Sequence, residues 1–314
     1  MRAALAATPG TGIVLAAVSG GADSLALLAA LAWEGPRQQR AVGVVHVDHA
    51  LQPGSAAQGE RVAAQARRLG VTDVRIERAK PAARPTAGHE ADARLARYDV
   101  LDAVARAGDV DAVFLGHTRD DQAEQVLLGL ARGSGARSLA GMPAVRGAYR
   151  RPLLGLTHES LVSACREQGL DVWEDPSNQD LRLLRNRVRH RVLPLLEAEL
   201  GPGIADALVR SADLLRSDAD LLDTLAAAAY DECAGSGNEP GLSVPALAAL
   251  PDALRTRVIR REVLSAGAPA SAVSRRHVRA AESLVVRWRG QGPVSLPGGL
   301  VAVRRCDRLV VEAP

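Results

Sequence analysis

The sequence predicts an α/β fold, a doubly wound parallel sheet, followed by a second, mostly helical domain that ends in a small β element. Between Ile13 and Arg132, short apolar runs alternate with amphipathic segments of helical length, as in a parallel sheet covered by helices. The break Gly201-Pro202-Gly203 then precedes a long Ala- and Leu-rich helical pattern. We therefore expect one domain over residues 1–201 and another over residues 202–314.

The expected strands of the first domain end in polar clusters. The strand-like runs are Ile13–Val18, Ala41–Val47, Asp73–Glu77 and Asp111–Leu115, and the helical patterns are Ala26–Ala32, Ser55–Leu69, Glu90–Arg106 and Asp120–Arg132. In such sheets, ligands bind beyond the carboxyl ends of the strands. The clusters Ser19–Ser24, His46–His49 and Gly116–Glu124 are therefore expected to share one edge of the sheet, the predicted active site.

The rest of the chain reads as loops, helices and a terminal β element. We expect Gly133–Arg151, which is glycine-rich and basic, to be a loop over the mouth of the pocket. Helical patterns occupy part of Pro152–Gly169 and the segments Leu183–Leu200, Ile204–Cys233, Pro251–Ser265 and Ser274–Arg289. Alternating patterns over Val294–Val311 indicate short strands joined by tight turns.

Composition excludes several classes of protein. The chain has 314 residues, of which 47% are hydrophobic, enough to bury a sizeable core. Its three cysteines, Cys165, Cys233 and Cys306, form no CxxC pair, which argues against a zinc ribbon, an iron–sulfur site or a disulfide framework. Without a signal peptide or a long apolar span, the sequence indicates a cytoplasmic protein with no membrane segment.

The first polar cluster has the residues of a phosphate-binding loop. Ser19, Gly20, Gly21, Ala22, Asp23 and Ser24 stand between a strand and a helix. Glycines allow a tight turn and a close approach to a ligand, and the free N–H groups of a helix start favour an anion. The loop lacks the lysine of a Walker A motif and the spacing of a dinucleotide fingerprint. The residues favour an anionic phosphate group, and the string SGGADS resembles the PP-loop of ATP pyrophosphatases, which implies that the loop binds ATP. The alternative is a plain tight turn.

Carboxylates at the same edge suggest a metal site. Asp121 and Glu124 are three residues apart and share a helix face. Nearby carboxylates repel unless a cation lies between them, and Mg²⁺ is bound by a few carboxylates together with substrate phosphates. We hypothesise that Asp23 and Asp121 hold Mg²⁺ on ATP, with Glu124 assisting. The alternative is that these acids only stabilise the first turn of a helix.

Two further groups are expected beside the nucleotide. His46 and Asp48 end a predicted strand and are expected to line the nucleotide pocket, unless they are ordinary polar loop residues. Arg94, Arg97 and Tyr98 share a helix face, and Arg97 is suited to neutralise a phosphate or a substrate carboxylate.

An arginine cluster suggests a nucleic-acid partner. Arg182, Arg185, Arg187, Arg189 and Arg191 surround Asn186 and His190, and their spacing spreads them over more than one side of a helix. A solvated face is the common meaning of a charge run, but some of these side chains must meet something other than water. Phosphate backbone is the obvious partner. Because only 2% of residues are aromatic, recognition is expected to use backbone and shape more than base stacking.

Seven strings in order identify a family. They are SGGADS, HVDHAL, ARLARYDVL, LGHTRDDQAEQ, RPLL, EDPSN and RNRVRHRVLP, over residues 19–194. The first resembles the PP-loop of ATP pyrophosphatases, and together they resemble the tRNA(Ile)-lysidine synthetase family. The second domain is similar to this family only in general character.

The resemblance implies a carbon–nitrogen ligase. Such an enzyme uses ATP to adenylate the C2 carbonyl oxygen of the wobble cytidine in the CAU anticodon of isoleucine tRNA, and free L-lysine then displaces AMP. It implies that Asp23, Arg97, Asp121 and Glu124 are catalytic, with Arg97 near the reacting base or lysine. It also places Arg94, Asp175, Asn178, Arg185, Asn186 and Arg189 near the tRNA or substrate. Asp48 and Glu124 both remain candidates for the base that takes the proton of lysine.

Other functions stay open at this point. A PP-loop tRNA thiolase would be expected to carry paired cysteines, and a ligase for small metabolites would not need the arginine cluster. A non-catalytic nucleotide- and RNA-binding relative would be expected to lose one of the acids. Dimerisation through Ile204–Cys233 is plausible. Arg275, Arg276, Arg279 and Arg287 are candidates for telling isoleucine tRNA from methionine tRNA.

Overall fold

The computed structural model describes the chain except for residues 49–54, 80–88, 134 and 236–239, and describes residues 89–91 by their backbone alone. The predicted polar residue His49 therefore lies outside the described residues. The chain forms two compact units, Met1–Leu215 and Arg216–Pro314. The division falls inside helix α10 (Ile204–Ala234), whereas the sequence places a boundary after Gly201.

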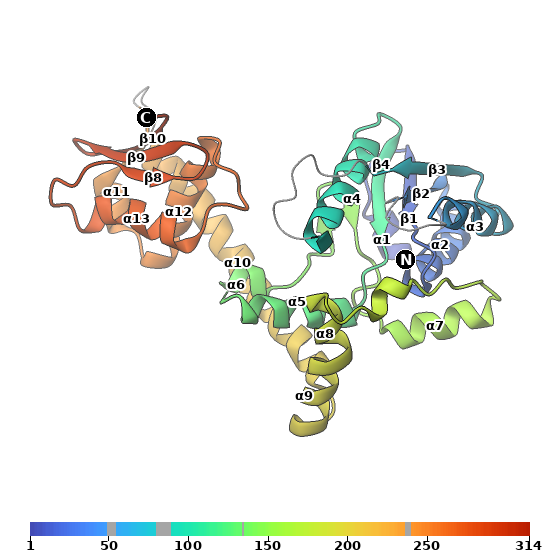
Figure 1. The fold of residues 1–314 in the computed structure, drawn as a ribbon. Coiled ribbons are helices and arrows are strands. Elements are labelled where there is room, and N and C mark those ends of the chain that lie inside the picture. The colour runs from blue at the N-terminus through green and yellow to red at the C-terminus, as the bar shows by residue number, and fades with distance from the viewer. Residues whose placement is uncertain (49–54, 80–88, 134, 236–239) are drawn as a thin grey trace. The chain divides into compact units, whose positions relative to one another are not determined.

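The first unit is built on a six-stranded sheet with the order β3-β2-β1-β4-β6-β5 (Figure 1). Its strands are β1 (Ile13–Ala17), β2 (Val42–Asp48), β3 (Asp73–Arg78), β4 (Val110–Leu115), β5 (Val145–Arg146) and β6 (Tyr149–Arg150). The pairs within β3-β2-β1-β4-β6 are parallel, and β5 is antiparallel to β6. The predicted doubly wound parallel sheet is confirmed, with a short antiparallel edge.

Helices cover both faces of this sheet. Successive side chains of a strand point to opposite faces, and because the central strands β1, β2 and β4 are mostly apolar, both faces must be buried. Val14, Ala16 and Val18 pack with α2 and α3, whereas Leu15 and Ala17 pack with α4. The helices before the arginine cluster are α1 (Arg2–Ala6), α2 (Ala22–Glu34), η1 (Pro36–Gln38), α3 (Ser55–Arg68), α4 (His89–Ala105), α5 (Arg119–Ala131), α6 (Ala136–Leu139) and α7 (His158–Glu167). Both faces of the sheet are therefore buried by apolar packing.

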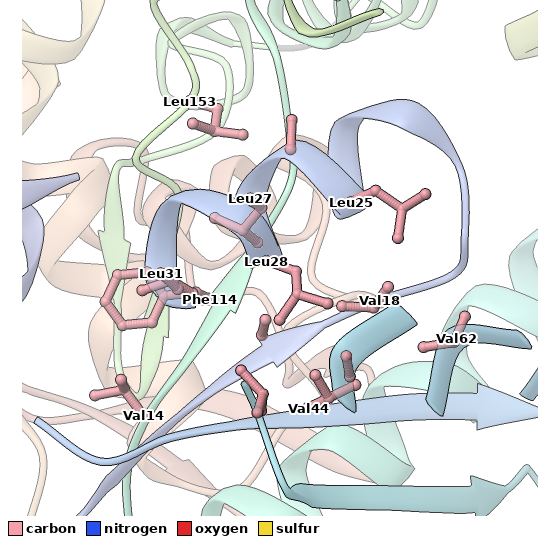
Figure 2. Packing of buried hydrophobic residues seen from close by; sticks show 14 of the residues in the cluster. Val14, Val18, Leu25, Leu27, Leu28, Leu31, Val44, Val62, Phe114 and Leu153 are labelled. Carbon is pink, nitrogen blue, oxygen red and sulfur yellow. The ribbon is translucent and has the colours of Figure 1, made fainter. Parts of the chain in front are cut away.

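Helix α2 anchors the loop that precedes it. Figure 2 shows Leu25, Leu27, Leu28 and Leu31 of α2 packed over β1, β2 and β4, where Phe114 is fully buried. Truncating one such leucine to alanine costs about 2–5 kcal/mol of stability in a well-packed core. The start of α2, which faces the predicted site, is thus held by a rigid core.

One sequence expectation about the first unit is wrong. Gly133–Arg151 is not a loop throughout, since it contains α6 and the hairpin of β5 and β6. Backbone pairing of β6 with β4 adds this hairpin to the sheet. Strands of two residues have no side-chain period, so the hydrophobic pattern does not reveal them.

The arginine-rich segment is helical but irregular. The segment predicted as one helix consists of α8 (Leu184–Arg187), a π-helical turn η3 (Val188–Val192) and α9 (Leu193–Leu200). A π-turn shifts the angular positions of the side chains around the axis. Before it, the short helix η2 (Pro176–Gln179) follows the N-cap residue Asp175.

The second unit packs the C-terminal part of α10 and the helices α11, α12 and α13 against a small antiparallel sheet. Its elements after α10 are β7 (Leu242–Ser243), α11 (Val244–Ala249), α12 (Asp252–Ser265), α13 (Arg275–Val286), β8 (Val294–Leu296), β9 (Leu300–Arg305) and β10 (Arg308–Glu312), with the sheet order β7-β10-β9-β8. Leu247, Ile259, Leu284 and Leu309 are fully buried in its core. The predicted helical character and terminal β element are confirmed, whereas β7 and α11 were not predicted.

Within the described part of the chain, no helix combines the length and the apolar character needed to cross a membrane.

Candidate active site

The loop between β1 and α2 is held by one hydroxyl. Oγ of Ser24 accepts hydrogen bonds from the N–H groups of Ser19 and Gly20, both at 3.2 Å, and donates to the carbonyl of Gly21 at 2.9 Å. Gly21, the N-cap residue of α2, makes no side-chain capping bond. The loop is therefore closed on itself, and the first N–H groups of α2 remain available to an anion.

Two glycines allow close approaches at this loop. Gly20 has a φ of +101°, and a Cβ on it would lie 2.0 Å from Nε2 of Gln58. A Cβ added to Gly116, which follows β4, would lie 2.9 Å from the carbonyl oxygen of Asp23. The end of β4 thus lies directly against the loop, and two of the predicted polar clusters meet at one edge of the sheet.

Asp23 contacts His158, a histidine outside the sequence patterns that predict the site. Nδ1 of His158, the first residue of α7, lies 2.8 Å from Oδ1 of Asp23. The backbone N–H of His158 donates to Asp120 at 2.6 Å. The hydrogen bond to Asp23 raises the pKa of His158. Oδ2 of Asp23 has no bonding partner among the described residues, so this carboxylate keeps one oxygen for a ligand.

Asp121 is bonded on both oxygens. Its Oδ2 accepts from the N–H and the hydroxyl of Thr118, the N-cap of α5, in a capping box. Its Oδ1 accepts from Arg185 at 2.8 Å and from Arg189 at 3.1 Å. Burial acts to raise the pKa of Asp121, but Arg185 and the other neighbours outweigh it and hold this pKa below its usual range.

The same two arginines bind Glu124, whose side chain is fully buried. Nε of Arg185 donates to Oε2 at 2.6 Å, and Nε of Arg189 donates to Oε1 at 2.5 Å. Arg185 and Arg189, predicted on the tRNA side of the pocket, therefore lie on the acids of α5 in this arrangement. Two carboxylates and two guanidinium groups form a compact network of nearly balanced charge.

Arg97 is a half-buried cation without an ion-pair partner among the described residues. Burial lowers its pKa, and the nearby charges include Arg94 and Asp121. Arginine remains protonated in proteins. Beside it, the rings of Tyr98 and Tyr149 meet edge to face at 5.4 Å, and the hydroxyl of Tyr149 donates to Asp102. An unpaired guanidinium beside an acidic cluster is suited to bind an anionic substrate group.

The other predicted nucleotide residues have mixed surroundings. His46 is buried, and its Nδ1 lies 2.8 Å from the carbonyl of Val18, to which it donates. Burial lowers the pKa of His46. Asp48 is the half-buried last residue of β2. Arg94 is exposed and stacks over Tyr98, with 5.1 Å from its guanidinium carbon to the ring centroid.

Three predicted tRNA residues stabilise their own segment. Asp175 caps η2 by accepting from the N–H of Ser177 at 2.8 Å. Nδ2 of Asn186 donates to the carbonyls of Ser177 and Asp180 at 2.8 and 3.0 Å. The carbonyl of Asn178 accepts from His190 at 2.9 Å, while its side chain is exposed. These bonds shape the segment that presents Arg185 and Arg189.

A second histidine, His117, lies at the end of β4. Nε of the buried Arg151 donates to its Nδ1 at 3.2 Å. Burial, reinforced by Arg97 and Arg151, lowers the pKa of His117 to about 3. The string Gly116-His117-Thr118 was visible in the sequence, but the contact with Arg151 depends on β6 pairing with β4.

The residues fit a magnesium–nucleotide complex through Asp23. Mg²⁺ commonly takes one or two protein carboxylates and completes its shell with phosphates and water. Asp23 offers a carboxylate oxygen beside the loop, whereas both oxygens of Asp121 and of Glu124 are bonded. The described residues contain no group of three or more His, Cys, Asp and Glu side chains arranged for a metal ion.

Both units match known families. A PP-loop domain matches residues 3–196, and a TilS substrate binding domain matches residues 242–310. The tRNA(Ile)-lysidine synthase of Streptomyces coelicolor is 50% identical over 307 residues, 97% of this chain and 86% of that protein. The tRNA(Ile)-lysidine synthase of Thermobifida fusca is 48% identical over 314 residues, which are 100% of this chain and 95% of that protein. That from Mycobacterium tuberculosis H37Rv is 48% identical over 94% of this chain and 89% of its own.

A solved structure shares the fold. The U34-tRNA thiolase NcsA from Methanococcus maripaludis, solved with its [4Fe-4S] cluster, aligns with a TM-score of 0.56 and 18% identity over 67% of this chain and 74% of its own. At this identity the likeness concerns the fold alone. The three cysteines here are all free. From the PP-loop match and the full-length relatives, the chain is an enzyme of the tRNA(Ile)-lysidine synthase family.

Proposed function

We propose that this enzyme uses ATP to adenylate the wobble cytidine of an isoleucine tRNA with a CAU anticodon and then joins free L-lysine to C2, forming lysidine. Two observations together carry the proposal: the Ser19–Ser24 loop lies against Gly116 at the end of β4, just before α5, and Arg97 lies near Asp121 of α5. The second unit of the chain matches a substrate binding domain of this family. A nucleotide bound at the loop, the carboxylates of α5 and the guanidinium of Arg97 would then face one reaction centre.

In the first step, the C2 oxygen of the base attacks the α-phosphate and pyrophosphate leaves. The N–H groups at the start of α2 hold phosphate oxygens, and Arg97 offsets their charge. Ser24 keeps the loop in place during this step. The poor ring-oxygen leaving group becomes part of AMP, a good one.

Mg²⁺ is proposed as part of the ATP complex, where it supplies positive charge to the triphosphate. Asp23 is its proposed carboxylate ligand, through the oxygen that His158 does not contact. Asp121, the second predicted ligand, accepts from Thr118, Arg185 and Arg189, so a role for it as ligand requires the two arginines to give up Oδ1.

In the second step, the ε-amine of lysine attacks C2 and AMP leaves. The amine must lose a proton, and Asp48 and Glu124 remain the candidates to accept it. Both oxygens of Glu124 already accept from arginine, so the network would have to rearrange before Glu124 binds the proton.

The tRNA is proposed to contact arginines of both units. Arg275, Arg276 and Arg287 are exposed, whereas Arg279 bonds to Asp252 and the buried Glu282. We keep the three exposed arginines as candidates for phosphate contacts and regard Arg279 as a structural residue.

A homodimer through α10 is a further proposal. Leu214, Leu221 and Leu225 of this helix are exposed, at spacings of one and two helical turns. Sedimentation of the full chain would test it, and a concentration-independent monomer would refute it. The cytoplasmic location expected from the sequence also stays a prediction.

The test of the function is incorporation of labelled L-lysine into an isoleucine tRNA transcript bearing CAU, with ATP and Mg²⁺. Omission of ATP and the variant Asp23→Ala are the controls, with Asp231→Ala as an exposed aspartate outside the site. Label that depends on ATP and on Asp23 supports the proposal. Pyrophosphate release on tRNA without label would leave adenylation standing and contradict lysine as the nucleophile.

A further inference from the structure

His117 and Arg151 form a contact that the reaction scheme above does not use. His117 lies between β4 and α5 and is half-buried, and Arg151 follows β6 and is 4% exposed. Nε–H of Arg151 donates to Nδ1 of His117 at 3.2 Å, and Nη1 of Arg151 donates to the carbonyl of Pro143 at 2.9 Å. The guanidinium is therefore fixed by two hydrogen bonds, one of them to the ring.

This contact decides which nitrogen of His117 carries the proton. A guanidinium has only N–H donors and does not lose its proton in proteins. Nδ1 must therefore present a lone pair to Arg151. A neutral imidazole with an unprotonated Nδ1 carries its proton on Nε2. The tautomer follows from the hydrogen bond, which is the proper basis for assigning it.

We propose that Arg151 is a positioning residue that holds His117 as a neutral imidazole with its proton on Nε2, and that this N–H donates a hydrogen bond to an oxygen of the α-phosphate that the base attacks. The proposal rests on the proposed function. It makes His117 a fixed donor rather than a proton acceptor.

The surroundings of His117 support this role. Within the described part of the chain, no residue accepts a hydrogen bond from Nε2 of His117. The charges that act on the ring come from Asp121, Arg97, Arg151 and Arg185, which are residues of the proposed reaction centre. A preorganised neutral donor stabilises negative charge that develops on a phosphate oxygen without giving up its proton.

His46 offers an internal comparison. Its Nδ1 faces the carbonyl of Val18 at 2.8 Å, and a carbonyl only accepts. His46 therefore carries its proton on Nδ1, the opposite tautomer. His46 and His117 are thus expected to differ in the protonation of Nδ1, which ¹⁵N NMR measures.

The first test is ¹⁵N NMR of the histidine rings in the full-length protein at neutral pH. The chemical shift separates protonated from unprotonated ring nitrogens. We expect an unprotonated Nδ1 in His117 and a protonated Nδ1 in His46. In Arg151→Met, His117 should shift toward a mixture of tautomers while His46 keeps its signals. A protonated Nδ1 of His117 in the wild type would overturn the proposal whether or not the variant folds.

The second test compares two amides at position 117. The side chain of His117→Gln places an N–H near the position of Nε2, whereas that of His117→Asn places its amide near Nδ1. The measured quantity is tRNA-dependent pyrophosphate release, and urea unfolding followed by circular dichroism is the control for folding. His117→Gln should stay within about tenfold of wild type, and His117→Asn should lose about 10²–10³-fold, the cost of a missing donor.

Equal loss in both variants, with an unchanged unfolding curve, would show that His117 acts as a base and would overturn the proposal. Failure of the proposed function looks different. In that case wild-type enzyme releases no pyrophosphate on isoleucine tRNA, although the tautomers of His117 and His46 are as expected.

Discussion

Arg185 reaches from α8 to the fully buried Glu124 of α5 and donates its Nε–H to Oε2 at 2.6 Å. Arg189, four residues later, binds the other oxygen of the same carboxylate. Ion pairs therefore bind the arginine-rich segment to the edge of the sheet where the candidate site lies. Such a network holds only while both signs are present, because a buried ion without a partner is costly.

Removing Glu124 should therefore destabilise the first unit. In Glu124→Ala, Arg185 and Arg189 keep only Asp121, and we expect a loss of about 3–5 kcal/mol in the free energy of unfolding, the usual cost of breaking a buried pair. Urea unfolding followed by circular dichroism measures it. Glu199→Ala, on the exposed end of α9, is the control and should stay near wild type. Equal stability of both variants would contradict a structural role for the network.

Gly20 should not tolerate a side chain. Gly20→Ala adds a Cβ at a φ of +101°, which strains the backbone of the loop, and places it 2.0 Å from Nε2 of Gln58, whose side chain must move aside. We expect ATP affinity to fall at least about tenfold, about 1.4 kcal/mol, measured by calorimetry.

Gly133→Ala is the matched control for Gly20→Ala. Gly133 also has a positive φ, +63°, but among the described residues other than its chain neighbours no atom lies within 4 Å of its added Cβ. This variant should lose about 1–2 kcal/mol of stability from backbone strain and keep its ATP affinity. If both variants bind ATP as wild type does, the loop geometry does not determine nucleotide binding.

The pKa of His117, about 3, gives the stability a pH dependence. The unfolded histidine, with a pKa near 6.5, binds a proton that the folded one does not, so stability falls as pH drops below about 6.5. Between pH 7 and pH 5.5, the free energy of unfolding should fall by about 1 kcal/mol more in the wild type than in His117→Gln. Urea unfolding at the two pH values measures this. An equal loss in wild type and His117→Gln would show that His117 is protonated in the folded state as readily as in the unfolded state.

The sequence predicted those features that local patterns determine. The alternation of apolar runs and helical segments predicted β1 to β4 and the helices between them. The glycine loop was predicted because its residue types, spacing and position between strand and helix agree. The hairpin of β5 and β6 was missed because its strands are stabilised by backbone pairing with β4, which leaves no pattern in two residues.

The partners of the arginines could not be predicted either. A run of charges shows that arginines are present, but Arg185 and Arg189 face the acids only because the chain turns through α8 and the π-helical η3. The same holds for Arg151, whose contact with His117 follows from the pairing of β6 with β4. Tertiary placement, rather than composition, decides whether an arginine faces a carboxylate, an imidazole or a substrate.

The last prediction separates two kinds of arginine on α13. Arg275 and Arg276 are exposed, and as phosphate contacts each should contribute about one unit to the slope of log affinity against log salt. The double variant Arg275→Ala with Arg276→Ala should lower this slope by about two for the isoleucine tRNA while the unfolding curve is unchanged.

Arg279 is the comparison residue on the same helix. Arg279 bonds to Asp252 and to the buried Glu282. Arg279→Ala should therefore lower the melting temperature of the second unit, and a change of salt slope without this loss of stability is not expected. Filter binding over a salt titration, with thermal unfolding of each variant, measures both effects. A double variant that keeps the full slope would remove Arg275 and Arg276 from the tRNA surface. A change of slope in Arg279→Ala at unchanged stability would mean that this arginine binds phosphate and that its contact with Glu282 is dispensable.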